Sequence, residues 1–186
     1  MIKAVILDFG GVVFRNKETY DGPQGNLQVD PEMWHQAGLG LVEDEVVFAQ
    51  MAKNHEVSPE EIKRWLFSKR EPNQELLDLL SNLKPGVKTA VLNNGLKTLF
   101  REFIAKYELE DKFEVLMNSA EEGVKKPDQE IYLRVCKKLG VEPENCLLVD
   151  DDQANINGSK TLGMEAILFT GVPELEARFR ELQLTG

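Results

Sequence analysis

The feature that most constrains the fold is an apolar, β-branched run near the start of the chain, which ends in an acid and two glycines. Residues 2–7 read Ile-Lys-Ala-Val-Ile-Leu, and Asp8, Phe9, Gly10 and Gly11 follow. Such a run has the length and composition of a strand buried on both faces of a parallel sheet. Asp8 would then stand at the carboxyl end of that strand, where open α/β sheets bind their ligands. The stretch therefore predicts an α/β fold and a carboxylate placed for chemistry.

Four further apolar segments alternate with amphipathic patterns through the second half of the chain. The predicted strands cover 88–92, 113–117, 145–150 and 165–169, and the predicted helices cover 97–107, 127–139, 153–162 and 173–182. This alternation is typical of a doubly wound parallel sheet. Between residues 15 and 85 the signals are helical after a polar connection over 15–30, and no convincing strand is present. Pro72 and Pro127 are expected to open helices. We therefore expect one α/β core with a helical insert.

Composition narrows the classes of function. A chain of 186 residues that is 42% hydrophobic supports one good core with a small appendage. No apolar run is long enough to span a membrane, and the N-terminus lacks the pattern of a signal peptide. Cys136 and Cys146 fit neither a disulfide framework nor a zinc site, so a reduced, cytoplasmic protein is expected. A net charge of −10 disfavours nucleic acid and membrane surfaces as partners, and the oligomeric state stays open.

Polar side chains gather where the predicted strands end. The residues concerned are Asp8, Asn93, Asn94, Lys126, Asp150, Asp151 and Asp152. Because parallel strands end at one edge of a sheet, Asp8 and Asp150 can be neighbours. Clustered carboxylates repel unless a cation lies between them, and Mg²⁺ binds one or two carboxylates, water and substrate phosphate. Lys126 can add a charge for that phosphate, and Asp8 can form an aspartyl-phosphate that water hydrolyses.

Four motifs in this order resemble those of the haloacid dehalogenase-like (HAD) hydrolase superfamily, most of whose members are Mg²⁺-dependent phosphatases. They are Leu-Asp-Phe-Gly-Gly-Val at 7–12, Val-Leu-Asn-Asn-Gly at 91–95, Lys-Pro at 126–127 and Leu-Val-Asp-Asp-Asp-Gln-Ala-Asn at 148–155. The resemblance covers the whole chain. It implies a HAD-like Rossmannoid fold, with a core formed by 1–16 and 71–186 and a small helical cap formed by 17–70.

The resemblance also implies roles for individual residues. Asp8 would be the nucleophile and a Mg²⁺ ligand, and Gly10 would offer its backbone carbonyl to the metal. Asp151 would bind the metal directly, and Asp150 would do so through water or from just behind it. Asn93 and Lys126, with Asn94 beside them, would hold the phosphoryl group of a small phosphorylated substrate. The substrate itself is not given by the sequence.

Two departures from the family pattern bear on activity. Gly10 replaces a second Asp, the usual general acid/base, and such a group contributes roughly 10²–10⁴-fold in rate. Asn93 replaces a Ser or Thr, and its amide donates in a different geometry. The chain is therefore expected to be a slow phosphatase, one that borrows an acid from the cap, or a silent one. Two alternatives stay open: a 2-haloacid dehalogenase, whose leaving group needs no acid, and a non-catalytic module that binds a phosphoester or a partner.

Other conspicuous residues carry weaker expectations. Arg15 follows the first motif and either reaches substrate or stays at the surface. His35 and His55 have no ligand partners at suitable spacing and are expected to be surface or cap residues. Trp34 and Trp65 are expected in the core of the cap rather than in a substrate site.

Overall fold

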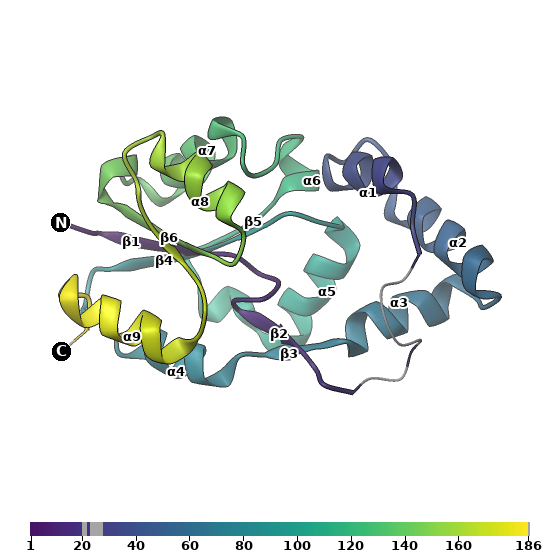
Figure 1. Ribbon diagram of the computed structural model, residues 1–186, viewed down its shortest axis with the longest axis horizontal. Helices are drawn as coiled ribbons and strands as arrows, with labels where there is room; N and C mark the ends of the chain where they lie inside the picture. The colour runs from purple at the N-terminus through teal and green to yellow at the C-terminus, as the bar shows by residue number, and fades with distance from the viewer. Residues whose placement is uncertain (20–21, 23–27, 186) are drawn as a thin grey trace.

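A five-stranded parallel sheet forms the centre of the computed structural model, which describes residues 1–19, 22 and 28–185 (Figure 1). The strand order is β5-β4-β1-β6-β7. The strands are β1 (Ala4–Leu7), β4 (Lys88–Asn93), β5 (Val115–Asn118), β6 (Cys146–Asp150) and β7 (Glu165–Leu168). All neighbouring pairs are parallel, and each strand coincides with a predicted one. The predicted doubly wound α/β fold is therefore confirmed.

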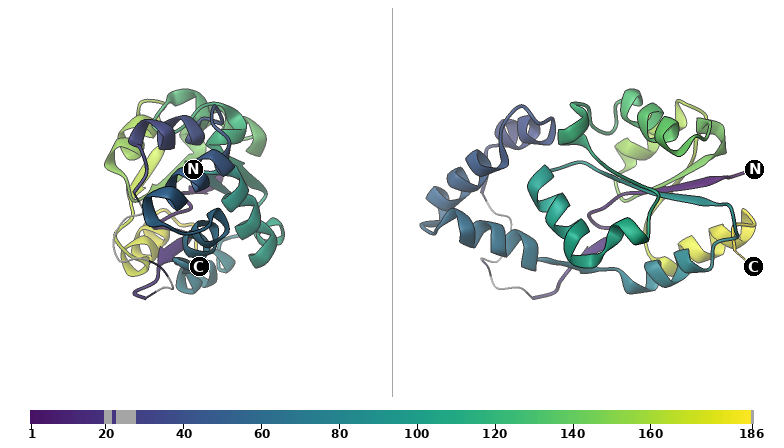
Figure 2. Two further views of the ribbon diagram at one scale, coloured as in Figure 1. Left: turned by 90° about the vertical axis from the view of Figure 1, so that its right-hand side faces the viewer. Right: turned by 180° about the vertical axis from the view of Figure 1, so that it is seen from behind.

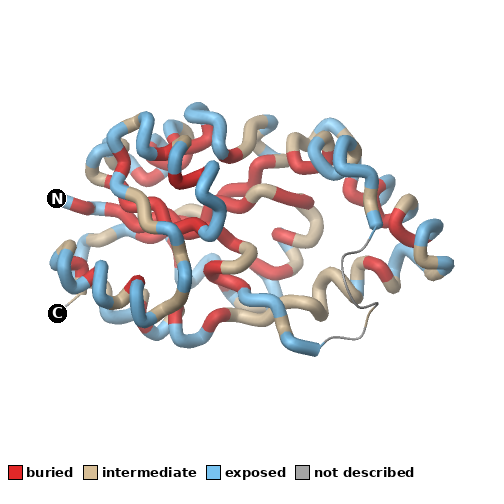
Figure 3. The backbone as a smooth tube through the Cα atoms, in the orientation of Figure 1, coloured by how far each residue is buried: buried red, intermediate tan, exposed pale blue. Residues whose placement is uncertain are grey.

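Helices cover both faces of this sheet (Figures 1 and 2). The helices on one face are α7 (Gln129–Leu139) and α8 (Gln153–Lys160), and those on the other are α4 (Gln74–Ser81), α5 (Lys97–Tyr107) and α9 (Val172–Glu181). Successive side chains of a strand point to opposite faces. Ala4 and Ile6 therefore pack under α7 and α8, while Val5 and Leu7 pack under the other helices. Figure 3 shows the strands as the buried centre of the molecule.

Three helices form a group of their own beyond one end of the sheet (Figures 1 and 2). They are α1 (Pro31–Gly38), α2 (Asp44–His55) and α3 (Pro59–Ser68). Ser58 caps α3 in a capping box with Glu61. Val47, Met51 and Ile62 form part of a separate small apolar cluster among these helices. The group lies within the predicted cap, whose exact division from the core stays a prediction.

The expectation of no strand between residues 15 and 85 is wrong. β2 (Phe14–Asn16) and β3 (Arg70–Pro72) form an antiparallel pair in which Asn16 lies opposite Arg70. Each strand has three residues, too few for a period-two pattern to be visible. The pair brings together the two chain segments that lead into and out of the three-helix group. Residues 20–21 and 23–27 of the polar connection predicted over 15–30 lie outside the described residues.

Two helix starts also differ from the prediction. Pro72 belongs to β3, and α4 begins after the N-cap Asn73; α7 begins after the N-cap Asp128 rather than at Pro127. In both cases an Asn or Asp side chain accepts the hydrogen bond that fixes the helix start.

The short helices are η1 (Leu109–Asp111), α6 (Ser119–Glu122) and η2 (Pro143–Asn145). Among the described residues, every helix is too short or too polar to cross a membrane.

Buried hydrogen bonds attach the three-helix group to the edge of the sheet. The Ser119 hydroxyl donates to the carbonyl of Gly38 at 2.6 Å and accepts from the amide of Gly95 at 3.2 Å. The Asp44 carboxylate accepts from the amide of Thr98 at 2.6 Å. Ser119 and Asp44 are both buried. The end of α1 and the start of α2 are therefore held against the segment that follows β4.

Replacing Ser119 by Ala should lower the free energy of unfolding by about 1–3 kcal/mol, because it leaves a buried carbonyl and a buried amide without partners. Urea unfolding followed by circular dichroism measures this loss. Ser81→Ala is the matched control, since Ser81 is exposed and bonds only within its own helix. Equal unfolding midpoints for the two variants would contradict the proposed attachment.

Candidate active site at the carboxyl edge of the sheet

Asp8 and Asp150 lie close together at the point where the order of the strands reverses. The chain runs from β1 to β4 and β5 on one side, and then to β6 and β7 on the other. β1 and β6 are therefore neighbours whose loops diverge, which is where open α/β sheets form a ligand crevice. The Asp8 amide donates to the Val149 carbonyl at 2.9 Å, and Phe9 is buried against the rings of Phe14 and Phe100. Pairing and aromatic packing thus fix the turn that presents the Asp8 carboxylate.

Lys126 joins the two carboxylates. Its Nζ lies 2.5 Å from Asp8 Oδ1 and 2.7 Å from Asp150 Oδ2, and the residue is only 2% exposed. Burial alone would lower the pKa of Lys126, but Asp8 and Asp150 raise it, so the side chain stays an ammonium. Burial raises the pKa of Asp8, and the Lys126 charge opposes that rise. The predicted neighbourhood of Asp8 and Asp150 is therefore present, with a lysine between them.

Asp150 is occupied by its neighbours on both oxygens. One oxygen accepts from Lys126, and the other accepts from the Asp152 amide and from Asn155 Nδ2, each at 2.9 Å. The residue is fully buried. Asp150 therefore holds Lys126 and the start of α8 in place, and Asp152 caps that helix. Asn155 is a site residue that the sequence offered only as the last letter of a motif.

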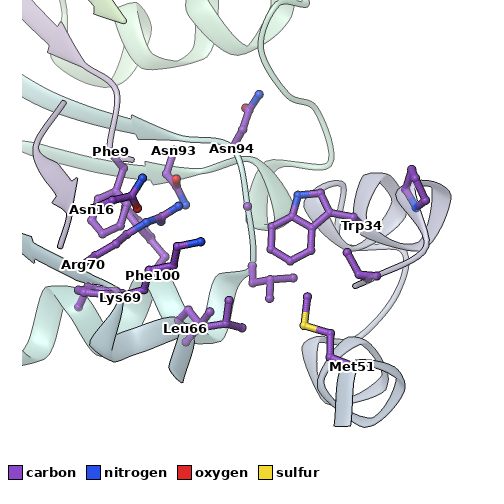
Figure 4. A pocket seen from close by; sticks show the side chains of 16 residues that line it. Phe9, Asn16, Trp34, Met51, Leu66, Lys69, Arg70, Asn93, Asn94 and Phe100 are labelled. Atoms are coloured by element: carbon purple, nitrogen blue, oxygen red, sulfur yellow. The ribbon is translucent and has the colours of Figure 1, made fainter. Parts of the chain in front are cut away.

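Asn94 fixes the loop that carries Lys126. Its side chain donates to the Lys126 carbonyl at 2.8 Å and accepts from the Lys126 amide at 3.0 Å. On the other side of the loop, a Cβ on Gly158 would lie 2.5 Å from the Pro127 carbonyl oxygen, so α8 packs directly on the backbone. Figure 4 shows Asn93 pointing into a pocket and Asn94 pointing away from it. The amide of Asn94 is therefore engaged by the loop, while Asn93 faces the open space.

Asp151 supplies the exposed carboxylate of the cluster. A Cβ on Gly11, which has φ +97°, would lie 2.0 Å from Asp151 Oδ2, so only glycine leaves room for this carboxylate. No other described residue donates a hydrogen bond to it. Burial and then the charge of Asp150 raise its pKa. Two carboxylates, Asp8 and Asp151, together with the predicted Gly10 carbonyl, form an oxygen donor set that fits Mg²⁺. Among the described residues no cluster of three or more His, Cys, Asp or Glu side chains is arranged for a metal.

A cavity of about 630 Å³ opens beside this cluster, between the core and the three-helix group (Figure 4). Its polar end includes Asn16, Arg70 and Asn93. Apolar side chains line much of the rest, and include Phe9, Trp34, Met51, Leu66, Leu99 and Phe100. A size of this order and an apolar lining with a few polar groups are typical of small-molecule sites. Trp34, expected only in the cap core, is 37% exposed and faces the cavity.

Arg70 is the site residue that the sequence missed. A Cβ on Gly10 would lie 3.1 Å from the Cζ and Nη2 atoms of Arg70, so the guanidinium lies against the first motif. Burial lowers the pKa of Arg70, but the charges of Asp8 and Asp151 oppose this, and the group stays charged. Nothing in its local sequence distinguishes it, because the β2–β3 pair alone brings it here. Arg15 instead is exposed and pairs with Glu71 at 2.9 Å.

The comparisons with known proteins identify the family. The sequence profile of the haloacid dehalogenase-like hydrolases matches residues 2–163, which is most of the chain. The chain belongs to this family. The fold agrees with that of a HAD-like family hydrolase from Porphyromonas gingivalis, with a TM-score of 0.76 at 19% identity over 97% of this chain and 98% of the other. A HAD family enzyme from Bacteroides thetaiotaomicron, solved with magnesium and inorganic phosphate, gives 0.75 at 22% identity over 90% and 93%.

Several curated relatives of this HAD-like hydrolase are phosphatases. A sesquiterpene phosphatase of Aspergillus oryzae is 28% identical over 177 residues, which cover 90% of each protein. A glyceraldehyde 3-phosphate phosphatase of Pyrococcus furiosus is 35% identical over 106 residues, which cover 55% of this chain and 44% of that protein. A drimenol cyclase of Aspergillus calidoustus is 22% identical over 98% of this chain but 37% of its own length. The chain thus spans less than half of two of these three relatives.

Replacing Lys126 by Met should destabilise the protein by about 3–5 kcal/mol at neutral pH in EDTA, because Asp8 and Asp150 are left as buried, uncompensated carboxylates. Urea unfolding measures the change. Lys125→Met is the control: Lys125 adjoins the site but bonds to His35 on α1, and its loss should cost about 0.5 kcal/mol.

Adding Asp150→Asn to Lys126→Met should recover part of the loss, since one of the two unpaired charges is then removed. Equal unfolding midpoints for Lys126→Met and Lys125→Met would contradict the bridging role of Lys126.

Proposed function

We propose that this HAD-like hydrolase is a Mg²⁺-dependent phosphatase that acts through Asp8 on small phosphate esters with an apolar body. The observation that carries the proposal is the Asp8–Lys126–Asp150 cluster beside a cavity lined by both apolar and polar side chains. The family supports the hydrolytic reaction, and the curated phosphatases support its phosphoryl substrate. The net charge of −10 agrees with a small substrate rather than nucleic acid. A cytoplasmic location stays a prediction.

The proposed reaction has two steps. A carboxylate oxygen of Asp8 attacks phosphorus, the bond from phosphorus to the leaving oxygen breaks, and an aspartyl-phosphate forms. Water then attacks that phosphorus, the bond from phosphorus to the Asp8 oxygen breaks, and the Asp8 carboxylate is restored, while the protons of the water leave with the released phosphate. Lys126 orients Asp8 and offsets the charge that gathers around it. Asn93, which faces the cavity, is proposed to donate to a phosphoryl oxygen, and Asn94 to act by fixing the Lys126 loop.

Asp8, Asp151 and the Gly10 carbonyl are proposed to hold Mg²⁺, and Asp150 to support them from behind through Lys126 and Asn155. When bound, the ion would offset phosphoryl charge and orient the ester. The Bacteroides thetaiotaomicron enzyme was solved with magnesium, which agrees with this assignment. The free, exposed carboxylate of Asp151 is the feature of this chain that best fits a metal ligand.

The apolar side chains of the cavity favour an apolar group as the other half of the ester. Apolar surface transferred out of water contributes about 25 cal/mol per Å², so a ring or branched chain gains more in this cavity than a sugar does. The polar residues stand mainly at the end that adjoins Gly10 and Asp8. A sesquiterpene phosphatase among the relatives is consistent with a substrate that has an apolar body.

Turnover of para-nitrophenyl phosphate with Mg²⁺ tests the reaction. Asp8→Asn and removal of Mg²⁺ by EDTA should each reduce turnover to background. Asp152→Asn is the control and should retain the wild-type rate, because Asn also caps a helix and Asp152 is exposed. Equal rates for Asp8→Asn and the native protein would overturn the proposal.

The same assay separates the alternatives. Chloride release from 2-chloropropionate in EDTA, with no aryl phosphate turnover, would favour a dehalogenase. Binding of inorganic phosphate without turnover of any ester would favour a non-catalytic module.

A ladder of para-alkylphenyl phosphates tests the apolar cavity, because the acidity of the phenol hardly changes along it. We expect kcat/KM to rise by up to about fourfold per methylene, the equivalent of about 0.8 kcal/mol. Leu66→Gln, in the cavity wall, should flatten this rise, whereas Leu41→Gln, at an exposed leucine of the same group, should not. A flat ladder in the native protein would contradict the assignment.

A further inference from the structure

The space beside Gly10 is filled by a cation. The Cβ of an Asp at this position would lie 3.1 Å from Cζ and Nη2 of Arg70 and 3.3 Å from Nη1, so the guanidinium would have to shift slightly to make room for it. The resemblance described above places a general acid at this position in the family. The Arg70 guanidinium therefore lies directly beside the position at which that acid is missing.

The Arg70 guanidinium is available to a ligand. Among the described residues its nitrogen atoms make no hydrogen bond or ion pair, although the charges of Asp8 and Asp151 act on it. Asp8 is engaged by Lys126 instead. Arg70 also lines the cavity, and Figure 4 shows its guanidinium beside Asn93. A charged group with five donors thus borders the cavity at the end where Asp8 would attack.

A guanidinium changes what the site can do for a departing oxygen. It stays protonated near neutral pH, so it cannot give a proton to an alkoxide. It can donate two hydrogen bonds to an oxygen that has gained negative charge, and such fixed donors act most strongly where charge develops. A leaving group that is stable as an anion can depart with these hydrogen bonds alone and needs no proton.

We propose that Arg70 takes the place of the missing acid, binds the departing oxygen as an anion, and restricts the enzyme to substrates whose leaving group departs unprotonated. The inference rests on the proposed phosphatase function. As the Asp8–phosphorus bond forms, the bond between phosphorus and the leaving oxygen breaks, and that oxygen keeps the electron pair beside Arg70. Phenol and enol esters, acyl phosphates and phosphoanhydrides of an apolar group satisfy this condition, whereas esters of simple alcohols do not.

A series of aryl phosphates measures the role of Arg70. With para-nitrophenyl, meta-nitrophenyl, phenyl and para-methoxyphenyl phosphates, native kcat/KM should fall as the phenol becomes less acidic. Arg70→Gln should steepen that fall: we expect a loss of about 10²–10³-fold with phenyl phosphate, the cost of one oxyanion donor, and a much smaller loss with para-nitrophenyl phosphate. Arg70→Lys should restore part of the rate with phenyl phosphate.

Arg15→Gln is the matched control. Arg15 lies on β2 and pairs with Glu71, the neighbour of Arg70, but is exposed and outside the cavity. Its removal should leave the dependence on the phenol unchanged. Circular dichroism of every variant checks that the fold is intact.

Replacing Gly10 by Asp tests the same contact by introducing a carboxyl group beside Arg70. In the native background the new carboxylate meets Arg70 and should pair with it, so we expect no gain in rate. With Arg70→Gln in addition, the carboxyl group is free to act as an acid, and turnover of phenyl phosphate should rise at least tenfold over Arg70→Gln alone.

The outcomes are distinct. A uniform loss across the series for Arg70→Gln, or none, overturns the role of Arg70 while Asp8-dependent turnover stands. A large gain from Gly10→Asp alone also overturns it. Absence of turnover with every ester, in the native protein with Mg²⁺, overturns the phosphatase function and this inference with it.

Discussion

The contact on which the rest of the site depends is the bridge from Lys126 to Asp8 and Asp150. Two carboxylates at adjacent strand ends repel in a buried setting, and a buried ammonium offsets that repulsion. The surrounding structure is arranged to hold this cation: Asn94 fixes the backbone of Lys126, and Asn155 fixes the far oxygen of Asp150. Because both supports come from different strands and helices, the charge cluster also links the two halves of the doubly wound sheet.

The second constraint is the short β2–β3 pair. It joins the two chain segments that lead into and out of the three-helix group. The same pairing places Arg70 against Gly10 and at the edge of the cavity. One backbone ladder thus connects the position of the helical group with the charge beside the nucleophile. Arg70 is far from the first motif in the sequence but lies beside it in the structure. The position where the family has an acid, Gly10, is therefore next to a cation.

Much of the fold could be predicted from the sequence because its signals are local. A buried parallel strand is a continuous apolar run, and all five predicted strands of the sheet are present. The ends of the strands could be predicted too, and with them the meeting of Asp8 and Asp150. The three-residue strands could not, because they are too short for a periodic pattern. The starts of α4 and α7 differ because Asn73 and Asp128 cap helices after a proline that the pattern placed inside them.

The sequence by itself determined the α/β class, the family, and the set of oxygen and nitrogen groups at the edge of the sheet, because each depends on residue types at strand ends. Only the tertiary structure decided which of those groups are engaged by neighbouring residues and which are exposed. It engages Asn94 with the Lys126 loop, surrounds Asp150 with partners, leaves Asp151 exposed, and brings Arg70 to Gly10. These outcomes depend on distances between segments far apart in the chain, and no local pattern records such distances.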